Sequence, residues 1–209
     1  MISIEFARAL YPAKADSAHD FDHVLRVVAM ADRIAQAEGA DREIVQAAAL
    51  LHDIGLDEGR AGHETSAANR ARAILREQGY TDAFCAAVAH AIESHRFRSG
   101  PTPQTLEAKV LFDADKLDAI GAIGVARAFA FGAHRGQKLW GTVPPGYSDQ
   151  LDGVETDPRQ HTAVHEFHVK LSKIKDRMFT LTGKRIADER HAFMIKFYEQ
   201  LDLEVRGDK

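Results

Sequence analysis

The chain has 209 residues and a formal net charge of −4 at pH 7; 45% of its residues are hydrophobic and 28% are charged. This balance is ordinary for a globular protein, and the length suffices for one domain with a sizeable apolar core. The slight negative charge gives no electrostatic basis for duplex nucleic acid or an anionic membrane surface as the main partner.

The sequence gives no sign of a membrane segment or an export signal. No apolar stretch approaches the length of a transmembrane helix, and Met1–Glu5 lacks the basic and apolar pattern of a signal peptide. Cys85 is the only cysteine and lies among apolar residues, so we expect a buried thiol without an intramolecular disulfide. A cytoplasmic location is the resulting expectation.

Apolar residues recur at helical spacing nearly throughout the chain, and no strand pattern is found, which predicts an all-α fold. Asp41 and Thr81 have the character of N-caps, whereas Gly39, Gly79 and Gly183 stand where helices are expected to end. The expected helices cover residues 3–10, 18–38, 41–54, 63–78, 81–95, 105–118, 119–131, 158–181 and 184–205.

Residues 132–157 have little periodicity and interrupt this helical pattern. A segment of this length is usually a functional or mobile loop. Its Trp140 and Tyr147 could stack on a base, anchor an interface or pack locally. The predicted organisation is a single domain over residues 1–209, with a metal-binding core at about 15–131, this loop, and a C-terminal helical pair at about 158–205.

The pair His52–Asp53 follows the apolar run Ala48–Leu51 inside a helix that is expected to be buried. Two adjacent polar side chains in such a place need partners. His23 and Asp115 lie in two other apolar helical segments, and a shared divalent cation would satisfy both imidazoles and both carboxylates. A surface-capped His52–Asp53 pair and a lone core histidine at position 23 are the structural alternatives.

These motifs resemble those of the HD-domain metal-dependent phosphohydrolase superfamily. HDFDHVLRV is similar to its first-histidine motif, ALLHDIG to its His–Asp motif and FDADKLDAIGAIGVAR to its last-aspartate motif. GHETSAANRARAIL, AIESHRF and KLSKIKDRMFTLTGKRIADERHAFM resemble a bacterial branch with nucleotide pyrophosphohydrolases, the YpgQ/YedJ-like branch. The resemblance covers about residues 15–203 and implies an HD-domain helical bundle.

The resemblance implies one set of metal ligands: His23, His52, Asp53 and Asp115. Asp113, Asp115 and Asp118 do not share one helix face. Asp115 is favoured because the last ligand of the family follows Ala and precedes a basic residue and Leu, which leaves Asp113 and Asp118 as capping residues or supports of the ligands.

One position departs from the family pattern. Many relatives carry an acidic residue three positions after the motif aspartate, where this chain has Leu56. Asp57 and Glu58 follow directly, so the role of that acid is either shifted or absent.

Two imidazoles and two carboxylates suit an octahedral divalent cation. We expect one ion, with Mn²⁺ favoured and Fe²⁺, Co²⁺, Ni²⁺ or Mg²⁺ as alternatives. HD relatives with two metals use further histidines, including an adjacent His–His pair that this chain lacks. His63, His90 and His95 nevertheless leave a second ion open.

Other side chains near the motifs are candidates for the chemistry. His63 or Glu64 could hold the attacking water or take its proton, and Lys116 could stabilise charge on a phosphate. The candidates for binding substrate phosphates are Arg26, His95 and Lys170. A helix-start residue without chemistry is the alternative for His63, and a structural salt bridge is the alternative for Arg26.

The resemblance implies a metal-dependent phosphohydrolase that converts nucleoside triphosphates to monophosphates and pyrophosphate with an activated water. A phosphomonoesterase or a cyclic-nucleotide phosphodiesterase is the enzymatic alternative. A metal- or nucleotide-binding regulator without turnover is the non-enzymatic one. A small-molecule nucleotide or phosphate ester is the expected partner, and the sequence determines neither the base and sugar nor the oligomeric state.

Overall fold

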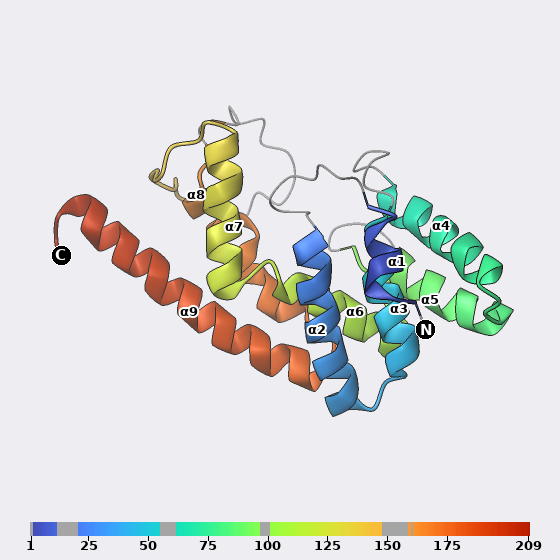
Figure 1. Ribbon diagram of the computed structural model, residues 1–209. Coiled ribbons are helices and arrows are strands. Elements are labelled where there is room, and N and C mark those ends of the chain that lie inside the picture. Colours follow the sequence, from blue (N-terminus) through green and yellow to red (C-terminus); the bar gives the residue numbers. More distant parts are fainter. Residues whose placement is uncertain (1, 12–20, 55–61, 97–100, 148–158, 160) are drawn as a thin grey trace. The chain divides into compact units, whose positions relative to one another are not determined.

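Every regular element in the part of the chain that the structure describes is a helix, which confirms the all-α prediction. The computed structural model describes residues 2–11, 21–54, 62–96, 101–147, 159 and 161–209 (Figure 1). Its elements are α1 (Ile4–Arg8), α2 (Phe21–Glu38), α3 (Arg42–Leu51), α4 (His63–Glu77), α5 (Asp82–Glu93), α6 (Leu106–Leu117), α7 (Gly121–His134), α8 (Ala163–Val169), the 3₁₀ helix η3 (Leu171–Arg177) and α9 (Leu181–Arg206).

The predicted caps set the limits of the helices near the candidate site. Asp41 Oδ1 accepts hydrogen bonds from the backbone N–H of Glu43 at 2.9 Å and of Ile44 at 3.2 Å. Thr81 Oγ1 starts α5 in the same way. Gly39 ends α2 with φ of 77°, a left-handed conformation in which a side chain would be strained. Local side-chain chemistry therefore explains these boundaries.

The region after residue 158 differs from the prediction. The single helix expected over 158–181 is instead α8 followed by η3, because Lys170 leaves the helical conformation with φ of −132°. The last helix begins at Leu181 rather than after Gly183. A Cβ at Gly183 would lie 2.3 Å from Asp113 Oδ2. Gly183 thus permits a close approach of the Asp113 carboxylate to the first turn of α9, and does not separate two helices.

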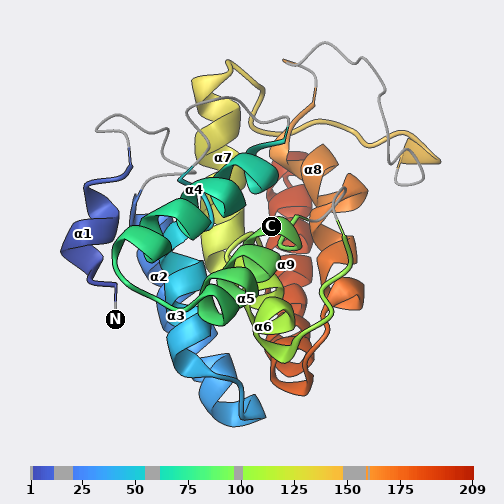
Figure 2. The ribbon, with the colours of Figure 1, turned by 90° about the vertical axis from the view of Figure 1, so that its right-hand side faces the viewer.

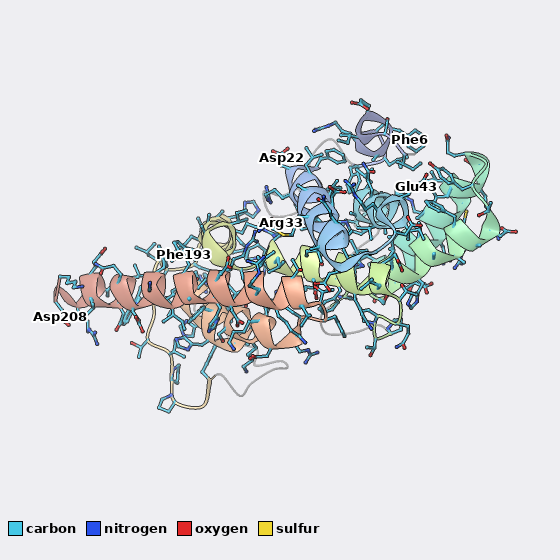
Figure 3. The ribbon with its side chains drawn as sticks, turned by 90° about the horizontal axis from the view of Figure 1, so that it is seen from below. Phe6, Asp22, Arg33, Glu43, Phe193 and Asp208 are labelled. Atoms are coloured by element: carbon cyan, nitrogen blue, oxygen red, sulfur yellow. The ribbon has the colours of Figure 1, made fainter. Side chains whose placement is uncertain are left out.

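The chain forms two compact units, of which the first contains Met1–Lys116 and Met178–Gly183. Here α3 packs against α2 and α5, and α4 packs against α5 (Figure 2). Figure 3 labels Asp22 and Arg33 on α2 and Glu43 at the start of α3. The predicted central helix is confirmed, because Val45 and all of Ala47–Leu51 are buried. Since α3 is surrounded by other helices, its C-terminal end lies inside the unit.

The second unit contains Leu117–Arg177 and Lys184–Lys209. Helix α8 packs against α7 and η3. An aromatic group links α8 to α9: the rings of Phe167 and Tyr198 are stacked with centroids 4.4 Å apart. On α9, Phe193, labelled in Figure 3, is 45% exposed. The predicted boundaries of a core, a loop and a C-terminal helical pair stay predictions.

The end of α7, the burial of Cys85 and the character of the helices can be compared with the sequence expectations. Helix α7 continues to His134, so the irregular segment begins three residues later than predicted, and its residues 148–157 lie outside the described part. Cys85 is buried, as expected. Across the described helices, none combines the length and the apolar character needed to cross a bilayer.

Candidate metal centre

The His52–Asp53 pair lies at the end of α3 and not within a helix, which corrects the sequence prediction. The helix ends at Leu51 and His52 is its C-cap. His52 is fully buried and Asp53 is 7% exposed. His52 keeps helical backbone angles, with φ of −63° and ψ of −31°, and its Nε2 lies 3.4 Å from Asp53 Oδ2.

A backbone hydrogen bond fixes the tautomer of His52. Its Nδ1 lies 2.8 Å from the carbonyl oxygen of Ala49. Because a carbonyl can only accept, Nδ1 carries the proton and Nε2 of the neutral ring carries a lone pair. This Nε2 is buried, has no hydrogen-bond partner among the residues that the structure describes, and faces the Asp53 carboxylate. Two acceptors that face each other in a buried place need a cation or a proton between them.

A first group of possible metal ligands contains His23, His52 and Asp115, whose ligand atoms lie within 4.8 Å of one another. His23 Nε2 lies 3.4 Å from Asp115 Oδ1 and 3.8 Å from Asp53 Oδ2. The structure therefore brings together the four side chains that the sequence motifs pointed to, from α2, the end of α3, and α6.

A second group contains Asp53, His63 and His95, again within 4.8 Å of one another. His63 Nε2 lies 3.7 Å and His95 Nε2 3.8 Å from Asp53 Oδ1. The Nδ1–H of His95 donates to the carbonyl of Ile92, which leaves its Nε2 as an acceptor. Asp53 thus presents one carboxylate oxygen to each group.

Charged side chains flank both groups. Lys116 forms an ion pair with Asp115. Arg96 Nη1 donates to both carboxylate oxygens of Glu64 at 3.1 and 3.3 Å, and Glu64 Oε2 lies 3.4 Å from His63 Nδ1. Lys116 offsets one buried carboxylate and Arg96 offsets Glu64. Apart from the imidazoles, these pairs leave the carboxylate of Asp53 without a cationic side chain, and this negative charge favours a bound cation or a protonated imidazole.

The protonation states suit metal ligands. Burial raises the pKa of Asp53, but His52 and His95 more than offset this and hold it below its usual range. Burial also raises the pKa of Asp115, which Lys116 and the histidines hold well below its usual range. Burial lowers the pKa of His95 to about 4. Both carboxylates are therefore ionised and His95 is neutral near pH 7, as metal coordination requires.

The pKa of His52 is shifted in the opposite direction from that of His95. Burial alone lowers its pKa, but the nearby carboxylates of Asp53 and Asp115 outweigh burial and raise the pKa above its ordinary value. The raised pKa has the same cause as the cation preference of the site, namely negative charge in a place with little water.

The three aspartates of α6 and its C-terminal flank have different partners. Asp113 is fully buried and accepts hydrogen bonds from the N–H of Phe179 and from the N–H and hydroxyl of Thr180, at 2.9, 2.8 and 2.6 Å. Asp118 lies in the second unit, where Arg127 donates to it at 2.7 Å. Asp115 is the one that faces the histidines.

Other predicted residues lie elsewhere or stay untested. Arg26 is partly exposed on α2, one turn after His23, and Lys170 lies in the second unit, where it pairs with Glu166 at 3.3 Å. Their roles in substrate binding stay predictions. His90 is in neither ligand group, and its Nε2 accepts from the N–H of Gln104. Leu56, Asp57 and Glu58 lie outside the described residues.

Three residues near the cluster were missed by the sequence analysis. Tyr11 Oη donates to the carbonyl of Leu50 at 3.0 Å, and Arg70 donates to the carbonyl of Ile54. These bonds hold the end of α3, where the helix leaves carbonyls without partners. Arg96 pairs with Glu64. Arg96 lies inside the AIESHRF motif and could have been noticed there. Tyr11 and Arg70 act across elements, and no sequence signal marks them.

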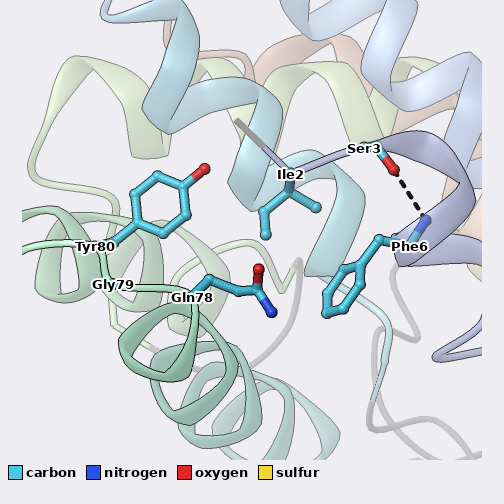
Figure 4. Close-up of a pocket in the computed structure, with 6 residues that line it drawn as sticks. All are labelled: Ile2, Ser3, Phe6, Gln78, Gly79 and Tyr80. Atoms are coloured by element: carbon cyan, nitrogen blue, oxygen red, sulfur yellow. Dashed lines mark hydrogen bonds between the residues drawn. The ribbon is translucent and has the colours of Figure 1, made fainter.

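The first unit also has a cavity of about 360 Å³ at the start of α1 (Figure 4). Its lining residues are Ile2, Ser3, Phe6, Gln78, Gly79 and Tyr80. Ser3 Oγ is occupied by the N–H of Phe6 at 3.1 Å. This lining contains no carboxylate, imidazole or cationic side chain, so it offers no chemistry comparable to that of the histidine–aspartate cluster.

Comparison with known proteins agrees with this geometry. The sequence matches the HD domain family over residues 20–120. It is 35% identical over 195 residues to YpgQ of Bacillus subtilis (strain 168), covering 91% of this chain and 86% of YpgQ. The crystal structure of B. subtilis YpgQ in complex with ADP has a TM-score of 0.76 and 32% identity, covering 99% of this chain and 100% of that chain.

A second solved structure, described as an HD-superfamily hydrolase from Bacillus thuringiensis, has a TM-score of 0.75 and 32% identity. The match covers 97% of this chain and 94% of that chain. The likeness therefore extends well beyond the residues that form the cluster.

Proposed function

This chain belongs to the HD-domain superfamily, in the branch of YpgQ, and on that premise we propose that it is a divalent-metal-dependent hydrolase that releases pyrophosphate from nucleoside triphosphates. The membership confirms the resemblance inferred from the motifs and supports the coarse class of HD-superfamily hydrolase. One observation carries the proposal: within the described part of the chain, the buried Nε2 of His52 has no hydrogen-bond partner, and it faces the carboxylate of Asp53.

The ligands of the first ion in this proposal are His23, His52, Asp53 and Asp115. Their mixed nitrogen and oxygen donors suit octahedral divalent ions, with Mn²⁺ favoured over Fe²⁺, Co²⁺, Ni²⁺ and Mg²⁺. When bound, such an ion polarises a phosphoryl oxygen and activates water. Two carboxylates compensate the charge of this ion, so we expect this site to bind more tightly than the second group.

The second group supports a second, weaker ion. Asp53 turns Oδ1 toward His63 and His95, and both imidazoles face it through Nε2. The sequence favoured one ion because an adjacent His–His pair is missing. In the structure, histidines from α4 and from the end of α5 meet at one carboxylate oxygen without such a pair. We therefore propose a ligand role for His95 in place of a phosphate donor, and the same role for His63.

The surrounding charges support phosphate chemistry. Hydrolysis of a phosphoanhydride depends mainly on positioning and on stabilising negative charge. Lys116 places an ammonium group beside Asp115, where it can stabilise a bound phosphate. Glu64, held by Arg96, orients the ring of His63 through Nδ1. In this proposal, Glu64 and Arg96 position a metal ligand and Lys116 offsets negative charge, and water is the nucleophile.

The nucleotide part of the proposal is supported by the relative. YpgQ, at 32% identity over essentially the whole chain, was crystallised in complex with ADP. A nucleoside diphosphate contains the base, the ribose and two phosphates of a triphosphate substrate. Release of pyrophosphate is the outcome that the motif resemblance implies, and it requires cleavage of the anhydride bond between the α- and β-phosphates by water, with the water oxygen ending on either product.

The experiment is a panel of ribo- and deoxyribonucleoside triphosphates, monophosphates and cyclic monophosphates with Mn²⁺. We expect nucleoside monophosphate and pyrophosphate as products, and at least about a 100-fold loss of the hydrolysis rate in Asp53→Ala. The control is Asp22→Asn, an exposed aspartate beside His23. Orthophosphate from monophosphates would indicate a phosphomonoesterase, and ring opening a cyclic-nucleotide phosphodiesterase. Nucleotide binding without turnover would indicate a regulator. Full activity in Asp53→Ala would exclude the metal centre.

A further inference from the structure

The second unit contains a cavity that the metal chemistry does not use. Its volume is about 480 Å³, within the range typical of small-molecule sites. Residues that line it include Lys138, Trp140, Gly141, Tyr147, Thr162 and His165. Trp140 is partly exposed and Lys138 is exposed, whereas Tyr147 is buried. The cavity thus combines aromatic surface with a cationic side chain.

One wall of the cavity is held by a chain of polar contacts. Tyr147 Oη lies within hydrogen-bond distance of His161 Nδ1, at 2.8 Å, and the carboxylate of Glu166 on the other side of the ring can only accept, so Nε2 carries a proton. That Nε2–H donates to Glu166 Oε2 at 3.0 Å. Lys170 pairs with Glu166 Oε1 at 3.3 Å. The hydroxyl of Tyr147 is therefore occupied, and its ring is fixed as a wall of the cavity.

A second set of contacts fixes His165 and Thr162, which also line the cavity. His165 Nδ1 lies 3.4 Å from the N–H of Thr162 and 2.8 Å from its hydroxyl, a capping box at the start of α8. The ring of Tyr147 meets that of His165 edge to face at 4.8 Å. A Cβ at Gly141 would lie 3.0 Å from His165 Cε1, so the backbone passes tightly over the imidazole. The cavity is preorganised, which lowers the entropy cost of binding.

The chemistry of the lining selects the ligand. Aromatic side chains stack on nucleobases because every base has a π-face, and an ammonium group attracts phosphate. We propose that this cavity binds a nucleoside phosphate, with the base against Trp140 and Tyr147 and the phosphate toward Lys138, without a metal ion. The proposal goes beyond the proposed hydrolysis and does not rest on it. The bound molecule is a second nucleotide, separate from any substrate held at the metal centre.

The sequence provides a reporter, because Trp140 is the only tryptophan of the chain. AMP and ADP are titrated into the full-length protein in EDTA, with tryptophan fluorescence and calorimetry as readouts. We expect a saturable fluorescence change and heat with both nucleotides, and neither with ribose 5-phosphate or pyrophosphate, which lack a base. Absence of saturable heat with AMP and ADP, or equal binding of ribose 5-phosphate, would overturn the proposal.

Variants assign the binding to the cavity. Calorimetry with ADP in EDTA is repeated on Trp140→Leu, on Lys138→Gln, and on Leu139→Ala, whose side chain is 66% exposed and does not line the cavity. We expect the Trp140 variant to bind at least about tenfold more weakly. The Lys138 variant should lose affinity for ADP but not for adenosine, and the Leu139 variant should match wild type. Unchanged affinity in the Trp140 variant would overturn the proposal.

A second arm tests whether the cavity binds a nucleotide separately from the metal centre. The stoichiometry of a non-hydrolysable triphosphate analogue is measured with Mn²⁺ in wild type and in Trp140→Leu. Two molecules per chain, of which the variant loses one, support the separate site. One molecule per chain in wild type overturns the proposal. Absence of turnover would leave the titration in EDTA untouched, so failure of the proposed hydrolysis is distinguishable.

Discussion

Asp113 and Asp115 lie two residues apart on α6, yet Asp115 faces His23 at 3.4 Å while Asp113 holds Thr180 through two hydrogen bonds. The same side-chain chemistry thus serves two purposes within one helix turn. Asp113 joins α6 to Phe179 and Thr180, directly before α9, and Asp115 contributes to the candidate metal centre.

This division predicts that two matched variants lose different properties: one loses stability and the other loses metal affinity. Asp113→Asn should lower the free energy of unfolding in EDTA by about 2 kcal/mol, because one of the two buried oxygens that accept from Phe179 and Thr180 becomes an amide NH2 group, which cannot accept. It should retain Mn²⁺ binding. Asp115→Asn should lose most Mn²⁺ affinity and the rise in melting temperature that bound metal gives wild type. Urea unfolding and calorimetry measure both; a similar loss of Mn²⁺ affinity in both variants would contradict the division.

The position of Asp53 between the two ligand groups predicts metal binding in two steps. Calorimetric titration of the metal-free protein with Mn²⁺ should resolve a tighter and a weaker site. His95→Ala removes a ligand from the second group alone, so the weaker step should disappear while the tighter one remains. His90→Ala is the control, because His90 lies outside both groups. A single step in wild type would limit the centre to one ion.

The contact between Glu64 and His63 predicts a positioning role for Glu64. Glu64→Gln should weaken the second Mn²⁺ step by about 10- to 100-fold, because the imidazole loses the carboxylate at its other nitrogen. Glu77→Gln, an exposed position on the same helix, provides the matched control. The first Mn²⁺ step should be unchanged in both variants. If Glu64→Gln binds both ions as wild type does, Glu64 has no positioning role.

The hydrogen bond from Tyr11 predicts that the end of α3 is stabilised from a different element. Tyr11→Phe should lower the free energy of unfolding by about 1 kcal/mol and weaken the first Mn²⁺ step, because the carbonyl of Leu50 loses its donor. Tyr80→Phe, in the cavity of Figure 4, changes the same group away from the cluster and should affect neither quantity. Equal effects of the two variants would show that the bond from Tyr11 does not support the site.

Most of the fold could be predicted because helix signals are local. The caps Asp41 and Thr81 act within a few residues, and the apolar run before His52 is buried as its composition suggested. The predicted start of the last helix was wrong, because a contact between residues distant in sequence determines the role of Gly183. Gly183 looked like a helix end, but its lack of a side chain makes room for Asp113, some seventy residues earlier in the chain.

The sequence by itself determined the residue types of the candidate centre, because the HD motifs single out His52, Asp53 and Asp115. Only the tertiary structure decided which atoms face one another. It ended α3 at Leu51 and placed His95 against the second oxygen of Asp53. The physical reason is that donor direction depends on tautomers and on the packing of helices distant in sequence, and neither is encoded in residue spacing.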